Sequence, residues 1–488
     1  MLEKFGLRTY HSAGLRQFTA AAAAAALVSS CATTVTGNPT SPLSDPFNVA
    51  GMHAVGGPSG LRPNAPGASR PVSNTDGGQF DRVAAQSISD IEDFWKSNYR
   101  NTFPGEFEPV RELFSWDSEA TSGTFCGMDT AELINAAFCY DDNTIGWDRG
   151  VLLPALSQAR GDMAITTVLA HEYGHAIQQM ASINPENVAS IVREQQADCF
   201  AGVYLRWVVE GTSSRFTLNT SDGLNGVLAA MLAFRDPPRF MGERPDGSEH
   251  GSAFERVSAL QNGFTSGASD CVAIDLAEIK QRRGTLPQRL PADQSGETPV
   301  SDVSVRIAIE AMSVLFPLKR QPQLTFNPSQ ALSCPDARPS PPASYCPATN
   351  TIVADIPGLR EIGTPSKKLS GRGLQGDNTA YSALISRYMV AWQHERDGLS
   401  LNNAPAGLRT ACLTGVATTK LSKSTTTPSG NTFALAAGDI DEAVAGLLTN
   451  GVVASDVNGD SVPAGFSRID AFRAGVTGYE DYCIQRFP

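Results

Sequence analysis

An internal repeat constrains the fold of this chain more than any other feature of its sequence. Four blocks recur in the same order, at offsets of 207 to 213 positions. The paired blocks are Cys126 with Cys334, 139–148 with 346–355, 197–203 with 410–416, and 254–271 with 466–483. Ordered blocks at nearly constant offsets are the signature of a repeated structural unit. We therefore predict two tandem copies of one domain, over residues 79–292 and 296–488.

The cysteines divide evenly between the two copies. Apart from Cys31, each copy holds four, and even numbers of cysteines in an exported chain predict disulfides. Four cysteines permit three pairings in each copy. We favour the pairing of Cys126 with Cys139 and of Cys334 with Cys346, because these near cysteines flank short, turn-rich loops. The other pairs are then Cys199 with Cys271 and Cys412 with Cys483.

The N-terminus has the pattern of an export signal. Basic residues precede an apolar run over 20–28 that is too short to remain in a membrane as a spanning helix. The residues that end at Cys31 resemble a bacterial lipobox. We predict a lipoprotein signal peptide over 1–30 and lipidation of Cys31, which would hold the protein on the outer face of the cell membrane. The alternative is an ordinary secretory signal.

Residues 31–78 are rich in Thr, Pro, Gly, Ser and Asn, which predicts a flexible tether. The rest of the chain is globular in composition. Of the 488 residues, 41% are hydrophobic and 18% are charged, and this length is enough for two domains with cores. The formal net charge of −12 and the lack of a basic stripe argue against nucleic acid as a partner.

The string HEYGH, which contains His171 and His175, has the spacing of a zinc site. On a helix these two residues lie one turn apart on the same face, so both imidazoles can reach one metal ion. A second segment with helical spacing, at about 188–209, presents Glu194 and Asp198 one turn apart. We predict Zn²⁺ bound by His171, His175 and Glu194, with a fourth position left for water. Asp198 would accept a hydrogen bond from His171, whereas the alternative for both acids is a solvated helix face.

Two further residues are candidates for catalysis. Zinc held by two imidazoles and a carboxylate lowers the pKa of its water towards 7. Glu172 would take a proton from that water as it attacks a carbonyl and deliver the proton to the leaving amine. His250 would be a substrate-binding or transition-state donor; the alternative is a solvated loop histidine.

The second copy lacks all of these residues. Where the first copy has His171, Glu172, His175, Glu194, Asp198 and His250, it has Ser386, Arg387, Val390, Gly407, Ala411 and Val462. We predict that the second copy keeps the fold, binds no zinc and is not catalytic. The strand-like segment 143–148 recurs in both copies, so it belongs to the scaffold, although as an edge strand it could align an extended peptide.

Three motifs of the first copy together resemble the putative neutral zinc metallopeptidase family of bacteria, a zincin-like group: HEYGH, EQQADCFAG at 194–202, and HGS at 250–252. The likeness covers about 120–272, and with the lipoprotein signal the chain resembles an actinobacterial lipoprotein peptidase. The resemblance implies a zincin fold, one zinc ion and peptide-bond hydrolysis, with the ligands and base assigned above. The expected fold class is α+β: a mainly helical zincin-like metallopeptidase domain with a small β-sheet, followed by a degenerate tandem copy.

The leading functional hypothesis is a membrane-anchored, extracytoplasmic zinc peptidase that acts on a peptide or protein substrate. Its second domain would serve as a packing partner or as a surface that recruits a protein. The competing class is a catalytically silent binding or scaffold lipoprotein whose zinc is structural or whose site is latent. A third hypothesis is zinc-dependent amide hydrolysis on cell-wall peptide.

Overall fold

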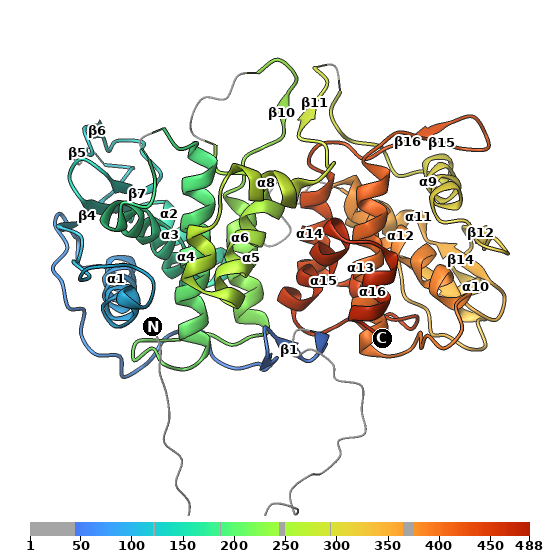
Figure 1. Cartoon of the computed structure of the whole chain (residues 1–488), viewed down its shortest axis with the longest axis horizontal. Coiled ribbons are helices and arrows are strands. Elements are labelled where there is room, and N and C mark those ends of the chain that lie inside the picture. Colours follow the sequence, from blue (N-terminus) through green and yellow to red (C-terminus); the bar gives the residue numbers. More distant parts are fainter. Residues whose placement is uncertain (1–43, 121–122, 186, 244–248, 293, 365–374) are drawn as a thin grey trace, which may run out of the picture. The chain divides into compact units, whose positions relative to one another are not determined.

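The computed structural model describes residues 44–120, 123–185, 187–243, 249–292, 294–364 and 375–488. The predicted signal peptide and Cys31 lie outside these residues. From Ser41 onward the chain forms one compact unit of many helices and small sheets, which confirms the mixed α+β class (Figure 1). Among the described residues, no helix is both long enough and apolar enough to cross a membrane.

The first half combines short strands with longer helices. Its strands are β1 (Asn48–Val49), β2 (Met52–His53), β3 (Gly60–Leu61), β4 (Glu112–Trp116), β5 (Thr124–Phe125), β6 (Met128–Asp129), β7 (Ala136–Cys139), β8 (Thr144–Asp148), β9 (Phe216–Thr217), β10 (Arg239–Phe240) and β11 (Arg289–Leu290). Its helices are α1 (Gln79–Asn98), α2 (Leu152–Arg160), α3 (Asp162–Ala181), α4 (Ser190–Val209), α5 (Asp222–Ala233), α6 (Ala253–Ser266), α7 (Ala268–Val272) and α8 (Leu276–Arg283), with the 3-10 turn η2 (Tyr99–Asn101).

The second half follows a similar order of elements. Its strands are β12 (Gln323–Thr325), β13 (Ala343–Cys346), β14 (Thr351–Ala354), β15 (Thr425–Thr426) and β16 (Thr432–Phe433). Its helices are α9 (Asp302–Leu315), α10 (Ser329–Leu332), α11 (Ile356–Ile362), α12 (Asp377–His394), α13 (Ala404–Leu421), α14 (Asp439–Thr449), α15 (Gly465–Thr477) and α16 (Glu480–Arg486), with the 3-10 turn η3 (Val452–Ala454).

A three-stranded sheet with the same topology occurs in each half. In the first half the order is β4-β8-β7, with β4 parallel and β7 antiparallel to the central strand. In the second half the order is β12-β14-β13, with β12 parallel and β13 antiparallel to the central strand. This agreement is what the internal repeat predicts.

Helices α4 and α6 cross backbone to backbone, and the crossing depends on glycine. A Cβ at Gly263 of α6 would lie 1.8 Å from the carbonyl oxygen of Cys199, and a Cβ at Gly202 of α4 would lie 2.0 Å from a carbonyl oxygen of α6. Gly415 and Gly475 make the same close approach between α13 and α15. Since any larger residue would separate the helices, each half fixes the distance between its two central helices in the same way.

The four predicted disulfides are confirmed. They join Cys126 to Cys139, Cys199 to Cys271, Cys334 to Cys346, and Cys412 to Cys483. The long-range bridges tie α4 to α7 and α13 to α16. The same helix pair is therefore covalently fixed in both halves.

The two halves share one hydrophobic core. The interpretation as two tandem domains did not predict this. Buried residues of both halves belong to a single cluster. The rings of Phe264 in α6 and Phe466 in α15 have centroids 4.9 Å apart, and the amide of Gln261 donates a hydrogen bond to the Phe466 carbonyl oxygen. Asp441 of α14 accepts a hydrogen bond from the backbone nitrogen of Phe254, at 2.9 Å. The apolar faces of these helices bury each other, so neither half has a closed core of its own.

The interpretation of residues 31–78 as a flexible tether is wrong for the part that the structure describes. Strand β3 pairs antiparallel with β9. The backbone nitrogen of Val55 donates to the Thr220 hydroxyl at 2.8 Å, and Nε of Arg62 donates to the Phe216 carbonyl oxygen at 2.9 Å. Val49 of this stretch is also buried in the core. Short strands held by backbone and side-chain hydrogen bonds, with few buried apolar residues, leave no apolar periodicity in a sequence.

Gly263→Ala should destabilise the protein, because the new methyl group would overlap the carbonyl oxygen of Cys199. We expect the free energy of unfolding to fall by about 2–3 kcal/mol in urea denaturation. Gly67→Ala is the control, since a Cβ at that position meets nothing within 4 Å. Equal stabilities of the two variants would contradict a backbone crossing of α4 and α6.

Asp441 should make the stability of the shared core depend on pH. Burial raises the pKa of its carboxyl group to about 6, although hydrogen bonds from the backbone and the charge of Arg235 oppose the shift. The folded protein then holds a proton that the unfolded chain has lost above about pH 4, so stability falls as pH rises from about 4 to about 6. In Asp441→Asn this loss should shrink by up to about 3 kcal/mol. Parallel pH profiles of stability for the two proteins would contradict the prediction.

Candidate metal centre

Helix α3 carries the HEYGH string and is buried on most of its faces. Gly174 permits the close approach of α4, because a Cβ there would lie 2.8 Å from the Cα of Ala197. The approach brings His171 and His175 of α3 against Glu194 of α4.

Three donor groups converge between these helices. Nε2 of His171 lies 3.2 Å, and Nε2 of His175 lies 3.5 Å, from Oε2 of Glu194. One donor atom from each of the three residues lies within 4.8 Å of the other two. Oε2 of Glu194 is buried and has no hydrogen-bond partner among the described residues. A buried carboxylate oxygen without a hydrogen bond needs another partner, and a cation held by the three donors would supply one.

The far nitrogens of both imidazoles are engaged, which turns their Nε2 atoms towards Glu194. Nδ1 of His171 lies 2.7 Å from Oδ1 of Asp198. Nδ1 of His175 lies 3.0 Å from the amide oxygen of Gln178 and 3.2 Å from the hydroxyl of Tyr140. Contacts of this kind fix the tautomer and the orientation of metal-binding histidines.

Asp198 is held in turn by Arg256 of α6. Nε and Nη2 of the guanidinium donate to the two carboxylate oxygens at 2.9 and 2.8 Å, a bidentate pair with both side chains buried. Burial would raise the pKa of Asp198, but Arg256 and His171 hold it below its usual value. Arg256 is placed by the start of α6, where Ser252 and Glu255 form a reciprocal capping box.

Glu172 lines the same cavity as Glu194, but it is not one of the three residues whose donor atoms lie together as possible metal ligands. Its Oε2 accepts a hydrogen bond of 2.9 Å from the backbone nitrogen of Phe138 in β7. Burial raises its pKa, while the neighbouring imidazoles of His171 and His175 oppose the shift. A glutamate held in this way can accept a proton nearer neutral pH than a solvated one.

His250 lies at the rim of the centre, and Asp236 holds it there. Asp236 accepts a hydrogen bond from the backbone nitrogen of His250 at 2.8 Å, and Nδ1 of the ring lies 3.3 Å from its other oxygen. Nε2 of His250 lies 3.8 Å from Oε2 of Glu194, and the side chain is 44% exposed. The ring is therefore positioned to meet a molecule that enters from solvent.

A cavity of about 360 Å³ joins these residues. His171, Glu172, His175, Glu194 and His250 all line it, together with β7. Asp198 stands behind His171 and is fully buried. The structure thus brings all six residues singled out in the first copy to one place.

The donor set fits zinc. Two imidazoles and one carboxylate are borderline-soft ligands of the kind that zinc prefers. The surrounding charge also favours a cation, because the carboxyl groups of Glu172, Glu194 and Asp198 lie around the two imidazoles. The centre therefore attracts positive charge where the three donors meet.

The corresponding region of the second half is filled by an arginine. Arg387 is fully buried and donates hydrogen bonds to the carbonyl oxygens of Val452, Ser455 and Asp456. Ser386 and Val390 beside it are buried too. Two other donor clusters occur among the described residues: Cys334 and Cys346 with Asp336, where the cysteines form a disulfide, and Glu297, Asp377 and Glu442, whose oxygen donors differ from a zinc set.

Sequence reasoning missed Tyr140, Gln178 and Asp236. Only Gln178 carried a signal, since it lies three residues after His175 on the same helix. The suggestion that 143–148 forms an edge strand is wrong, because β8 is the central strand of its sheet. The strand that borders the cavity is β7, since its Phe138 meets Glu172.

Arg256→Leu should destabilise the protein more than the matching change in the second half. Removing the guanidinium leaves the buried carboxylate of Asp198 with His171 as its remaining partner, at a cost of about 3–5 kcal/mol. Arg468→Leu is the control, because Arg468 forms no ion pair with a carboxylate among the described residues. Urea denaturation of the zinc-free proteins measures both effects, and equal losses would contradict the assigned pair.

Comparison with known proteins finds a family that the first half of the chain resembles. Residues 44–273 match the model of the family described as "Putative neutral zinc metallopeptidase". The uncharacterized protein Rv2575 of Mycobacterium tuberculosis is 29% identical over 206 residues, which cover 38% of this chain and 67% of that protein. The uncharacterized protein YpfJ of Escherichia coli is 26% identical over 198 residues, which cover 37% of this chain and 66% of that protein.

The chain thus spans about two thirds of the length of these relatives. No solved structure matches it. The matched segment contains the whole candidate centre and begins with the stretch that packs against β9. The resemblance drawn from the motifs is confirmed: residues 44–273 match the putative neutral zinc metallopeptidase family.

Proposed function

We propose that this chain is a zinc-dependent peptidase with one metal centre, in its first half. The observation that carries the proposal is the convergence of His171, His175 and Glu194 around a buried carboxylate oxygen that lacks a hydrogen bond. Catalytic zinc sites use three protein ligands and keep a position open, whereas structural sites are closed by a fourth. Cys199, which adjoins Asp198, is bonded to Cys271 and does not supply a fourth ligand.

Bound zinc would supply a Lewis acid that acidifies water and polarises a substrate carbonyl. Glu172 takes the proton from the attacking water and returns it to the leaving amine. The backbone nitrogen of Phe138 holds one oxygen of Glu172. His250 donates a hydrogen bond to the substrate oxygen as negative charge develops there, and Asp236 keeps its ring in place.

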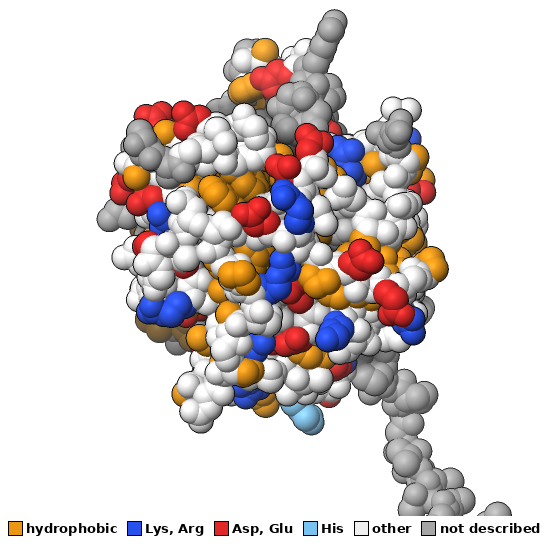
Figure 2. Space-filling view, turned by 90° about the vertical axis from the view of Figure 1, so that its left-hand side faces the viewer, with side chains coloured by type: hydrophobic (Ala, Val, Ile, Leu, Met, Phe, Trp, Pro, Cys, Tyr) orange, Lys and Arg blue, Asp and Glu red, His pale blue; other side chains and the backbone are white. Residues whose placement is uncertain are grey.

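We also propose that the protein works outside the cytoplasm, anchored by lipid on Cys31, with a peptide or protein as substrate. Its four disulfides are of the kind that form in oxidising compartments. On the face in Figure 2, basic side chains are scattered among acidic ones and form no continuous stripe. This pattern favours a peptide over nucleic acid as the partner of that face.

Residues 296–488 are, in this proposal, a degenerate copy of the peptidase domain without catalytic activity. The repeated sheet order, disulfides and glycine crossings support common descent of the two halves. Arg387 stands where the first half has its catalytic glutamate. The role of the copy is then to complete the core and to offer a surface to substrate or to a protein partner.

Zinc content and peptide hydrolysis, measured on the chain from residue 41 onward, test the proposal. We expect one zinc per chain, loss of zinc in His175→Ala, and about 10²- to 10⁴-fold slower hydrolysis with zinc retained in Glu172→Gln. His394→Ala is the matched control in the second half and should leave both readouts unchanged. Full zinc binding without turnover of any peptide would favour the scaffold hypothesis, and two zinc ions per chain would contradict the vacant second half.

A further inference from the structure

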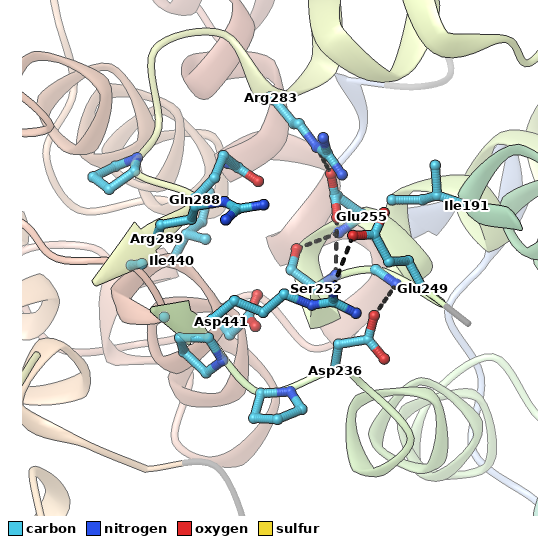
Figure 3. A pocket seen from close by; sticks show the side chains of 17 residues that line it. Ile191, Asp236, Glu249, Ser252, Glu255, Arg283, Gln288, Arg289, Ile440 and Asp441 are labelled. Carbon is cyan, nitrogen blue, oxygen red and sulfur yellow. Dashed lines mark hydrogen bonds and ion pairs between the residues drawn. The ribbon is translucent and has the colours of Figure 1, made fainter. Parts of the chain in front are cut away.

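A second cavity, of about 150 Å³, lies between the two halves. In Figure 3 its walls come from the first half through Ile191, Asp236, Glu249 and Arg289 of β11, and from α14 of the second half through Ile440. We name it the joint pocket. The walls meet tightly, because a Cβ at Gly438 of the second half would lie 2.9 Å from the ring of Pro238.

The joint pocket adjoins the metal centre along two elements. Ile191 lines the pocket and Glu194 lines the zinc cavity, three residues apart on the same side of α4, which separates their Cβ atoms by about 5–6 Å. Glu249 and Gly251 border the pocket, while His250 between them borders the zinc cavity. Since an extended peptide advances about 3.3 Å per residue, a substrate at the metal reaches the pocket within a few residues.

The charges that line the joint pocket are mostly paired. Glu249 lies 3.1 Å from Arg239, and Glu255 pairs with Arg283. Asp236 accepts backbone hydrogen bonds from the segment that carries His250. These carboxylates are therefore occupied by partners within the protein.

Arg289 differs from the other charged residues of the joint pocket. Its guanidinium donates to the carbonyl oxygen of Glu243, but no carboxylate pairs with it among the described residues. It is the register partner of Arg239 in the parallel pair of β10 and β11, so the two side chains project from the same face. Arg289 therefore brings to the pocket a guanidinium whose charge no described carboxylate balances, and such a group can bind an anion.

We propose that the joint pocket is a substrate subsite that binds a carboxylate, with Arg289 as the residue that recognises it. The carboxylate is either the side chain of an Asp or Glu residue near the scissile bond or the free C-terminus of a short peptide. The inference rests on the proposed function, because it takes the zinc cavity as the place where a peptide is cut. It also gives the second half a part in specificity, since α14 forms one wall of the subsite.

Zinc-loaded Glu172→Gln, which binds substrate without cutting it, is the background for a binding test. Fluorescence anisotropy compares peptides that carry Glu or Gln at each position, with the C-terminus free or amidated. A charged hydrogen-bonded pair predicts about ten- to a hundredfold tighter binding of the acidic peptide at one position, or of the free C-terminus. Which of the two is preferred identifies the source of the carboxylate.

Arg289 is then varied in the same background. Arg289→Ala should abolish the preference, Arg289→Lys should keep part of it, and Arg289→Glu should shift it towards basic peptides. Arg306→Ala is the matched control, because this exposed arginine lies over the ring of Phe326, far along the chain. Absence of an acidic preference, its survival in Arg289→Ala, or its equal loss in Arg306→Ala would overturn the proposal.

Turnover by the unaltered protein separates this proposal from the one on which it rests. Hydrolysis of peptides without an acidic preference overturns the subsite alone. Selective binding of acidic peptides without any hydrolysis overturns the peptidase and keeps the subsite. If the protein neither hydrolyses any peptide nor binds acidic peptides selectively, both proposals are overturned.

Discussion

The crossing of α4 and α6 at Gly202 and Gly263 is the constraint on which the rest of the structure depends. Because the two backbones touch, the distance is fixed between α4, which carries Glu194 and Asp198, and α6, which carries Arg256. Arg256 can then reach Asp198, and Asp198 can reach His171. The position of the His171 imidazole thus depends on a series of contacts that begins at the two glycines.

The parts of the centre that lie on single helices could be predicted from spacing. His171, Glu172 and His175 share one face of α3, and Glu194 and Asp198 share one face of α4, so helical periodicity alone groups them. Tyr140 and Asp236 could not be predicted in this way, because they enter from a loop and from the end of another element, and only the tertiary fold sets their distance from the histidines.

The same distinction holds for the fold. Cysteine spacing predicted the disulfides, since short loops favour near pairing and leave the remaining two cysteines to each other. The shared core was not predictable, because a helix that packs on its own domain and one that packs on a neighbouring copy bury the same kinds of residue. The ordered packing of residues 44–78 was not predicted for a related reason, because backbone pairing of short strands produces no pattern of hydrophobic residues.

The buried guanidinium of Arg387 limits which residues the second half can accept at this position. Its donors are satisfied by three carbonyl oxygens, and a carboxylate at that position would face those oxygens with nothing to donate. A change of Arg387 to glutamate is therefore opposed by these contacts. Under the proposal that the second half is a degenerate copy, this arginine would act as a ratchet: the half could change its surface and acquire new partners, but could not regain metal chemistry one residue at a time.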